Sequence, residues 1–142
     1  MTHVTFLHNV PDRLRAAAEW LAFPAQRGTP IAVLATDANL STLDRMLWES
    51  PSTGFTPHCR DGHRNAAETS IVLTSDLSTI VHNACVLNLT DAIPSGFERF
   101  DRLIEIISRN DADRLPGRDR YRYYRDHGYQ LENSDISRGF DQ

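Results

Sequence analysis

Two short, almost uninterrupted apolar runs constrain the fold of this chain more than any other feature. They cover residues 31–35 and 85–89. Runs of this length are typical of strands covered on both faces, as the strands of a parallel sheet are. Further strands are expected at residues 4–7 and 71–74. The chain is therefore expected to build a sheet that is buried between other layers.

Helical patterns alternate with these strands. The first helix is expected to begin at Asp12 and to end at residues 27–28, and the second to begin near Asp37 and to stop before Pro51. Residues 50–67 carry no periodicity and are expected to form a long loop with a short extended piece at Phe55. The alternation predicts a single three-layer α/β/α domain with a mostly parallel, mixed sheet.

Two more helices are expected in the second half of the chain. Ser95 and Glu98 match a capping box ahead of apolar residues at helical spacing, which predicts a helix over residues 95–107. Pro116 at the first position and Gly128 just past the end frame the last helix. The α/β domain is expected over residues 1–131, and residues 132–142 are expected to form a polar, frayed C-terminal tail.

The composition and charge limit the classes of function that the chain can have. The formal net charge is -4 and all 15 basic residues are arginine, so the chain as a whole is not expected to attract nucleic acid. It carries neither a signal peptide pattern nor a long apolar stretch, and its two cysteines make no disulfide framework. A cytoplasmic protein without a membrane partner is expected.

The last helix carries the most distinctive surface pattern. Helical spacing places four side chains on one face, and Arg114, just before the expected helix start, extends it; the set is Arg114, Arg118, Tyr121, Arg122 and Arg125. Guanidinium groups around an aromatic ring suit an acidic peptide with a free carboxylate. The alternative is a solvated helix face on which Asp119 and Asp126 pair with nearby arginines.

A second candidate surface lies at the end of the second helix and in the loop that follows it. Its large or rigid apolar residues are Trp48, Pro51, Phe55 and Pro57. Aromatic side chains in a polar loop are typical of interface hot spots. The alternative is that these rings anchor the loop to its own domain.

Little in the sequence indicates catalysis. His58, Cys59 and His63 are close together, but structural zinc takes four ligands and no third group marks Cys59 as a nucleophile. Residues 9–12, after the first strand, contain no glycine that would admit a phosphate, so the Rossmann-like arrangement lacks a phosphate-binding loop. We expect no catalytic residue, metal or cofactor. The alternatives are a small hydrolase or nucleotide-binding enzyme centred on His58, Cys59 and His63, or a direct single-stranded DNA-binding module.

The ordered set of motifs resembles the chi subunit of bacterial DNA polymerase III. The motifs occupy residues 5–7, 43–48, 55–58, 87–89, 97–102, 118–125 and 128–131. The resemblance runs nearly end to end; residues 60–68 and those after 131 depart from it. It implies a noncatalytic accessory subunit of the clamp-loader complex with the same α/β fold.

The resemblance also implies partners. Chi subunits bind the psi subunit and the acidic C-terminal tail of single-stranded DNA-binding protein, which ends in Pro-Phe with a free carboxylate. By resemblance, Arg114, Arg118, Tyr121 and Arg122 form the tail site, and the helical spacing adds Arg125. Trp48 and Phe55 belong to the psi-facing surface, flanked by Pro51 and Pro57, and a helicase is a further candidate partner there. DNA is then reached only indirectly.

Overall fold

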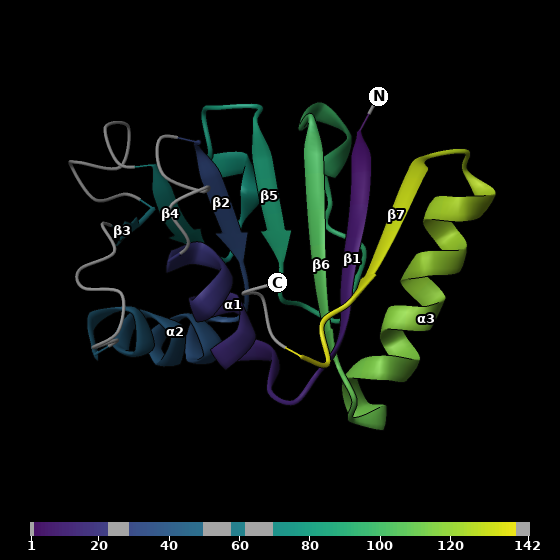
Figure 1. Cartoon of the computed structure of the whole chain (residues 1–142). Helices are drawn as coiled ribbons and strands as arrows, with labels where there is room; N and C mark the ends of the chain where they lie inside the picture. The colour runs from purple at the N-terminus through teal and green to yellow at the C-terminus, as the bar shows by residue number, and fades with distance from the viewer. Residues whose placement is uncertain (1, 23–28, 50–57, 62–69, 139–142) are drawn as a thin grey trace.

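The protein is built on one sheet whose strands run side by side in the order β3-β4-β2-β5-β6-β1-β7 (Figure 1). The structure is a computed structural model that describes residues 2–22, 29–49, 58–61 and 70–138. The strands are β1 (His3–Val10), β2 (Ile31–Leu34), β3 (His58–Arg60), β4 (Ile71–Thr74), β5 (Cys85–Asn88), β6 (Arg102–Ser108) and β7 (Gln130–Asp135). Every strand pair within the described ranges is parallel, which confirms the predicted α/β class.

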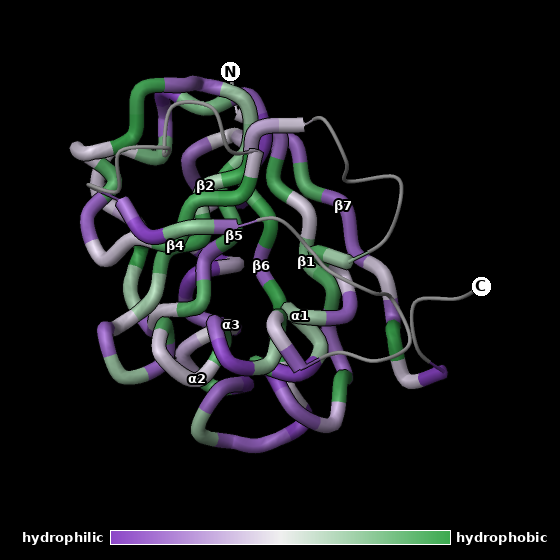
Figure 2. The backbone as a smooth tube through the Cα atoms, turned by 90° about the vertical axis from the view of Figure 1, so that its left-hand side faces the viewer, coloured by the Kyte–Doolittle hydropathy of each residue, from purple (hydrophilic) through white to green (hydrophobic). Residues whose placement is uncertain are grey.

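The helices cover the two faces of this sheet. On one face, α1 (Arg13–Ala22) and α2 (Asp37–Glu49) enclose a core with inward residues of the central strands. On the other face, α3 (Asp111–Asp126) packs with Phe6, Leu103 and Ile107 around the buried ring of Tyr124. In Figure 2, hydrophobic residues, coloured green, follow the strands between these layers. The three-layer arrangement follows because the strands β2, β4 and β5 are buried on both faces.

The helix predicted over residues 95–107 is wrong. A single 3-10 turn, η4 (Phe97–Arg99), is followed by the seven-residue strand β6. Gly96, at a φ of 85°, precedes the turn, so the Ser95 capping box does not form. The apolar spacing fits a helix, but the run is rich in β-branched isoleucine and pairs with β5 and β1 on its two sides. Pairing with β5 and β1 therefore makes this segment a strand, although its apolar spacing also fits a helix.

The frayed tail expected from residue 132 is also wrong for its described part. Residues Gln130–Asp135 form β7, which pairs in parallel with β1, and Ile136 is buried. The strand therefore crosses the boundary placed between residues 131 and 132. Likewise, the loop expected over residues 50–67 contains the short strand β3, whereas the extended piece at Phe55 falls on undescribed residues.

The last helix begins earlier than predicted. It starts at Asp111, so Pro116 lies inside α3 and not at its first position, and Arg114 lies within the helix. Gly128 follows the helix at a φ of 81°, as the expected end signal requires. The predicted end of the first helix at residues 27–28 lies outside the described residues. Within the described ranges, no helix is long and apolar enough to cross a membrane.

Candidate peptide-binding surface

The inner face of α3 is fixed by a buried carboxylate in the middle of the sheet. Glu105 of β6 is fully buried and accepts hydrogen bonds from Arg120 Nε and Nη2, both at 3.1 Å. Tyr124 Oη donates to the same carboxylate at 2.8 Å and Asn88 Nδ2 at 3.0 Å. A buried charge is tolerated only when it is paired and hydrogen-bonded in this way. The network therefore sets which side of α3 faces the sheet.

Two further features hold α3 against the sheet. A Cβ added at Gly117 would lie 2.7 Å from Ile107 Cδ1, so the glycine permits a close approach of the helix to β6. Burial first, and then the negative charge of Glu105, raise the pKa of Tyr124 far above its ordinary value. The Tyr124 hydroxyl therefore keeps its proton and remains a hydrogen-bond donor at neutral pH.

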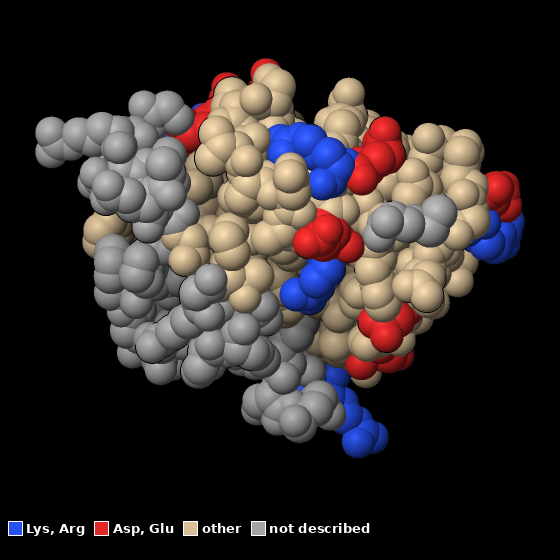
Figure 3. Space-filling view, turned by 90° about the horizontal axis from the view of Figure 1, so that it is seen from above, with Lys and Arg blue, Asp and Glu red and all other residues tan. Residues whose placement is uncertain are grey.

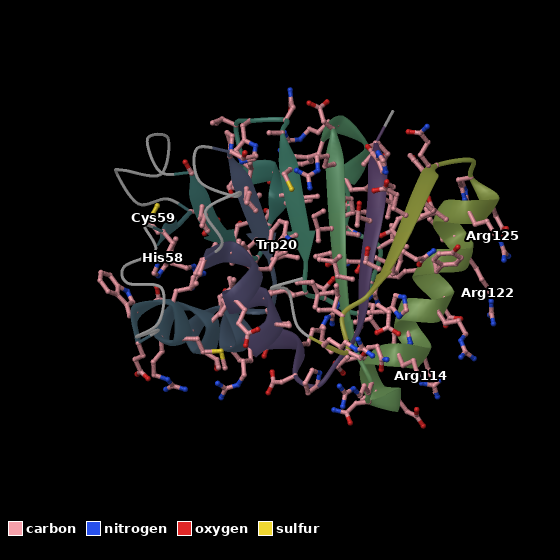
Figure 4. All side chains as sticks on the ribbon, in the orientation of Figure 1. Trp20, His58, Cys59, Arg114, Arg122 and Arg125 are labelled. Atoms are coloured by element: carbon pink, nitrogen blue, oxygen red, sulfur yellow. The ribbon has the colours of Figure 1, made fainter. Side chains whose placement is uncertain are left out.

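The outer face of α3 carries the arginines of the predicted peptide site. Arg118, Arg122 and Arg125 are exposed, and the labelled Arg114, Arg122 and Arg125 project away from the sheet in Figure 4. Three of the arginines have an aspartate partner on the helix: Arg114 with Asp111 at 2.6 Å, Arg122 with Asp119 at 3.3 Å and Arg125 with Asp126 at 3.2 Å. Arg118 has no ion pair within the part of the chain that the structure describes.

Tyr121 lies at the border of this arginine face. Its ring meets Phe6 of β1 edge-on, with 5.3 Å between ring centroids, and its hydroxyl accepts a hydrogen bond of 3.3 Å from Asn133 of β7. The side chain is half-buried, so one part of the ring is held by the domain and another part reaches solvent. The half-buried ring therefore lies beside exposed guanidinium groups, an arrangement that can take a negative charge next to an apolar group.

The second candidate surface is described only in part. Trp48, near the end of α2, is 60% exposed, and its ring meets that of His58 edge-on at 5.5 Å between centroids. Pro51, Phe55 and Pro57 lie outside the described residues. His58 follows Pro57 in the sequence of this surface, but its ring contact with Trp48 could not be inferred from local sequence.

The residues considered for catalysis do not assemble in the described ranges. His58 Nε2 lies 2.7 Å from Asp44 Oδ1, and His63 is outside the described residues. No three potential ligands among His, Cys, Asp and Glu come together within the described ranges. Burial raises the pKa of the Cys85 thiol to about 11, which makes it a poor nucleophile at neutral pH.

A polar cavity of about 330 Å³ lies at the carboxyl ends of the strands. Arg13, Asp91 and Asp113 are among its lining residues. The Arg13 guanidinium is largely used internally, since Nε donates to the Ile106 carbonyl at 2.7 Å and Nη2 to the Thr90 carbonyl at 2.9 Å. Burial lowers the pKa of this guanidinium. A lining with aspartates and an engaged arginine does not favour a phosphate group.

Fold and sites together define a doubly wound α/β domain whose first strand is followed by Pro11 and Asp12 in place of a glycine-rich phosphate loop. The family model for DNA polymerase III chi subunit, HolC, matches residues 1–132. The chain belongs to this family of DNA replication proteins.

Two relatives agree with this assignment. DNA polymerase III subunit chi of Pseudomonas aeruginosa is 31% identical over 104 residues, which cover 73% of this chain and 72% of that protein. DNA polymerase III subunit chi of Haemophilus influenzae is 24% identical over 102 residues, 71% of each chain. The family resemblance inferred from the motifs is therefore confirmed.

Proposed function

We propose that the chain is a noncatalytic adaptor of the DNA polymerase III holoenzyme. It links the clamp loader, through psi, to the acidic C-terminal tail of single-stranded DNA-binding protein. The single observation that carries the proposal is the outer face of α3, where exposed Arg118 and Arg122 lie in the same helical segment as the half-buried ring of Tyr121.

The arginines on this face differ in how readily they can take up a ligand carboxylate. Arg114, Arg122 and Arg125 must exchange an aspartate of their own helix for the ligand, whereas Arg118 has no such partner among the described residues. Exchange of an exposed pair costs little, because such pairs contribute about 0–1 kcal/mol. Arg118 is therefore proposed as the principal carboxylate ligand, with Arg122 beside it.

The distribution of charge supports the proposal that the chain reaches DNA only through single-stranded DNA-binding protein. Figure 3, which views the molecule from above, shows basic and acidic side chains interspersed over its described part. At the C-terminal end of α3, Arg125 pairs with Asp126. A net charge of -4 does not favour retention of DNA by the chain as a whole. A short acidic peptide needs only a local cluster of arginines.

Calorimetric titration with a tail peptide tests the proposal. The peptide carries several aspartates and ends in Pro-Phe with a free carboxylate; the same peptide with a C-terminal amide is the ligand control. Arg118→Ala is expected to weaken binding about 10-fold, the loss of one charge-assisted contact. Tyr121→Ala is expected to weaken it comparably, and added salt should weaken binding to the wild type.

The matched control is Arg45→Ala, which removes an exposed arginine from α2 on the opposite face of the sheet. This variant is expected to bind like the wild type. Circular dichroism checks that all variants are folded. Unchanged affinity in both Arg118→Ala and Tyr121→Ala would refute the assigned site.

The Trp48 surface is proposed to bind psi, and a helicase partner is proposed for the same surface. An exposed tryptophan is the side chain most typical of an interface hot spot. Trp48→Ala is expected to lose psi in a pull-down while it retains the tail peptide. Val81→Ala, which removes another exposed apolar side chain, is the control and should retain both. Loss of both ligands in Trp48→Ala would indicate unfolding and count against the separation of the two surfaces.

A further inference from the structure

Asp44, Trp48 and His58 form a compact cluster between α2 and the edge strand β3. Asp44 and Trp48 are one helical turn apart on α2, so their side chains share a face, and β3 brings His58 to that face. His58 Nε2 lies 2.7 Å from Asp44 Oδ1, and the His58 ring meets the Trp48 ring at an interplanar angle of 62°. The imidazole therefore contacts both the carboxylate and the indole.

Burial differs sharply within the cluster. The side chain of His58 is fully buried, whereas that of Asp44 is 43% exposed and Trp48 is 60% exposed. A carboxylate can only accept hydrogen bonds, so His58 Nε2 carries the hydrogen of this contact. The hydrogen bond orients this buried ring, and the ring lies edge-on against the exposed indole.

A second contact fixes the same part of β3 to α2. Arg60 Nη2 lies 3.1 Å from Asp37 Oδ1. Asp37 and Asp44 are seven residues apart, two turns of α2, and therefore face the same side. Because β3 has only three residues and stands at the end of the strand order, its ladder with β4 alone is a weak support. The two side-chain contacts explain how His58 is held at a defined place beside Trp48.

We propose that Asp44 and His58 are positioning residues that hold the Trp48 indole in an exposed, preordered orientation for an apolar segment of a partner protein. The inference rests on the proposed psi-binding function of this surface and adds residues that act through Trp48. Ordering one side chain on binding weakens affinity by about 3- to 10-fold, and a ring that is already ordered avoids this loss.

Binding of purified psi to a set of variants tests the positioning role. Asp44→Ala and His58→Ala are each expected to weaken binding about 3- to 10-fold. Asp44→Asn keeps an oxygen acceptor for His58 Nε2 and is expected to bind within about 2-fold of the wild type. Glu49→Ala removes the exposed carboxylate next to Trp48 and is the matched control, expected to bind like the wild type.

A double-mutant cycle separates positioning from direct contact with the partner. If Asp44 acts through the indole, Asp44→Ala has no further effect once Trp48→Ala is present. Additive losses would overturn the proposal, because they would mean that Asp44 contacts psi independently.

A readout without any partner distinguishes this inference from the proposed function. In protein labelled with 5-fluorotryptophan, the Trp48 fluorine resonance is assigned by its loss in Trp48→Phe. Asp44→Ala is expected to shift and sharpen this resonance toward that of a free indole, and Asp44→Asn to restore it. An unchanged resonance in Asp44→Ala would overturn the positioning role. Wild-type psi binding by Trp48→Ala, with a shifted resonance in Asp44→Ala, would instead refute the proposed psi surface alone.

Discussion

Both faces of α3 carry arginine, but the side chain is buried on the inner face and exposed on the outer face. On the inner face, Arg120 is 2% exposed and grips the fully buried Glu105 with two hydrogen bonds. On the outer face, Arg122 pairs with Asp119, but these side chains are 57% and 76% exposed. Water can replace either outer partner, whereas nothing replaces the inner ones. The inner arginine is therefore expected to serve stability and the outer arginines to serve recognition.

The largest effect that tests this comparison is expected from Arg120→Ala. The substitution removes the two hydrogen bonds from Arg120 and leaves the buried Glu105 carboxylate with only the more distant Arg13, whose Nη2 lies 3.9 Å from Oε1. The free energy of unfolding should fall by about 3–5 kcal/mol. Urea unfolding monitored by circular dichroism measures the change. Arg122→Ala is the matched control and should change the free energy of unfolding by less than about 0.5 kcal/mol. Similar losses in the two variants would break the distinction between the faces.

A smaller effect is expected from Tyr124→Phe, which removes one donor from Glu105 and leaves the ring in place. The expected loss is about 1.5–3 kcal/mol, since the acceptor is charged. Because the pKa of Tyr124 is raised in the folded protein, the folded state holds the phenolic proton more tightly than the unfolded state. The stabilisation is therefore complete below the ordinary tyrosine pKa of about 10 and declines above it.

Unfolding measured across this pH range in the wild type and Tyr124→Phe tests the sign. The difference between the two proteins should be constant at neutral pH and shrink in strong alkali. Tyr121→Phe, whose hydroxyl only accepts an exposed bond from Asn133, is the control and should show a much smaller difference. A difference that grows with pH would contradict the assignment.

The smallest effect is expected from Asp119→Asn on the outer face. The substitution removes the negative charge that pairs with Arg122 but keeps an oxygen acceptor, so stability should stay within about 0.5 kcal/mol of the wild type. The tail peptide should bind about 2-fold more tightly, because Arg122 then exchanges a neutral partner, and not a charged one, for the ligand carboxylate. Asp37→Asn, which removes the charge of the Arg60 partner on α2, should leave the peptide affinity unchanged. Weaker peptide binding by Asp119→Asn would show that Asp119 supports the site.

The pattern of apolar residues predicted the strands β2, β4 and β5, which are short and apolar throughout. Helical spacing predicted that Arg118 and Arg122 share one face of α3. The pattern failed at β6 and β7. Residues 95–107 satisfy helical spacing, and the polar β7 has no apolar alternation to mark it as a strand.

The sequence by itself therefore determined the α/β class, the chi family and the periodicity that collects arginines on one side of the last helix. Only the tertiary structure decided that Glu105 is a buried strand residue bound to Arg120, and that His58 stands between Asp44 and Trp48. The physical reason is that local periodicity records which face of an element is apolar. It does not record which distant charge or ring will meet that face when the layers pack.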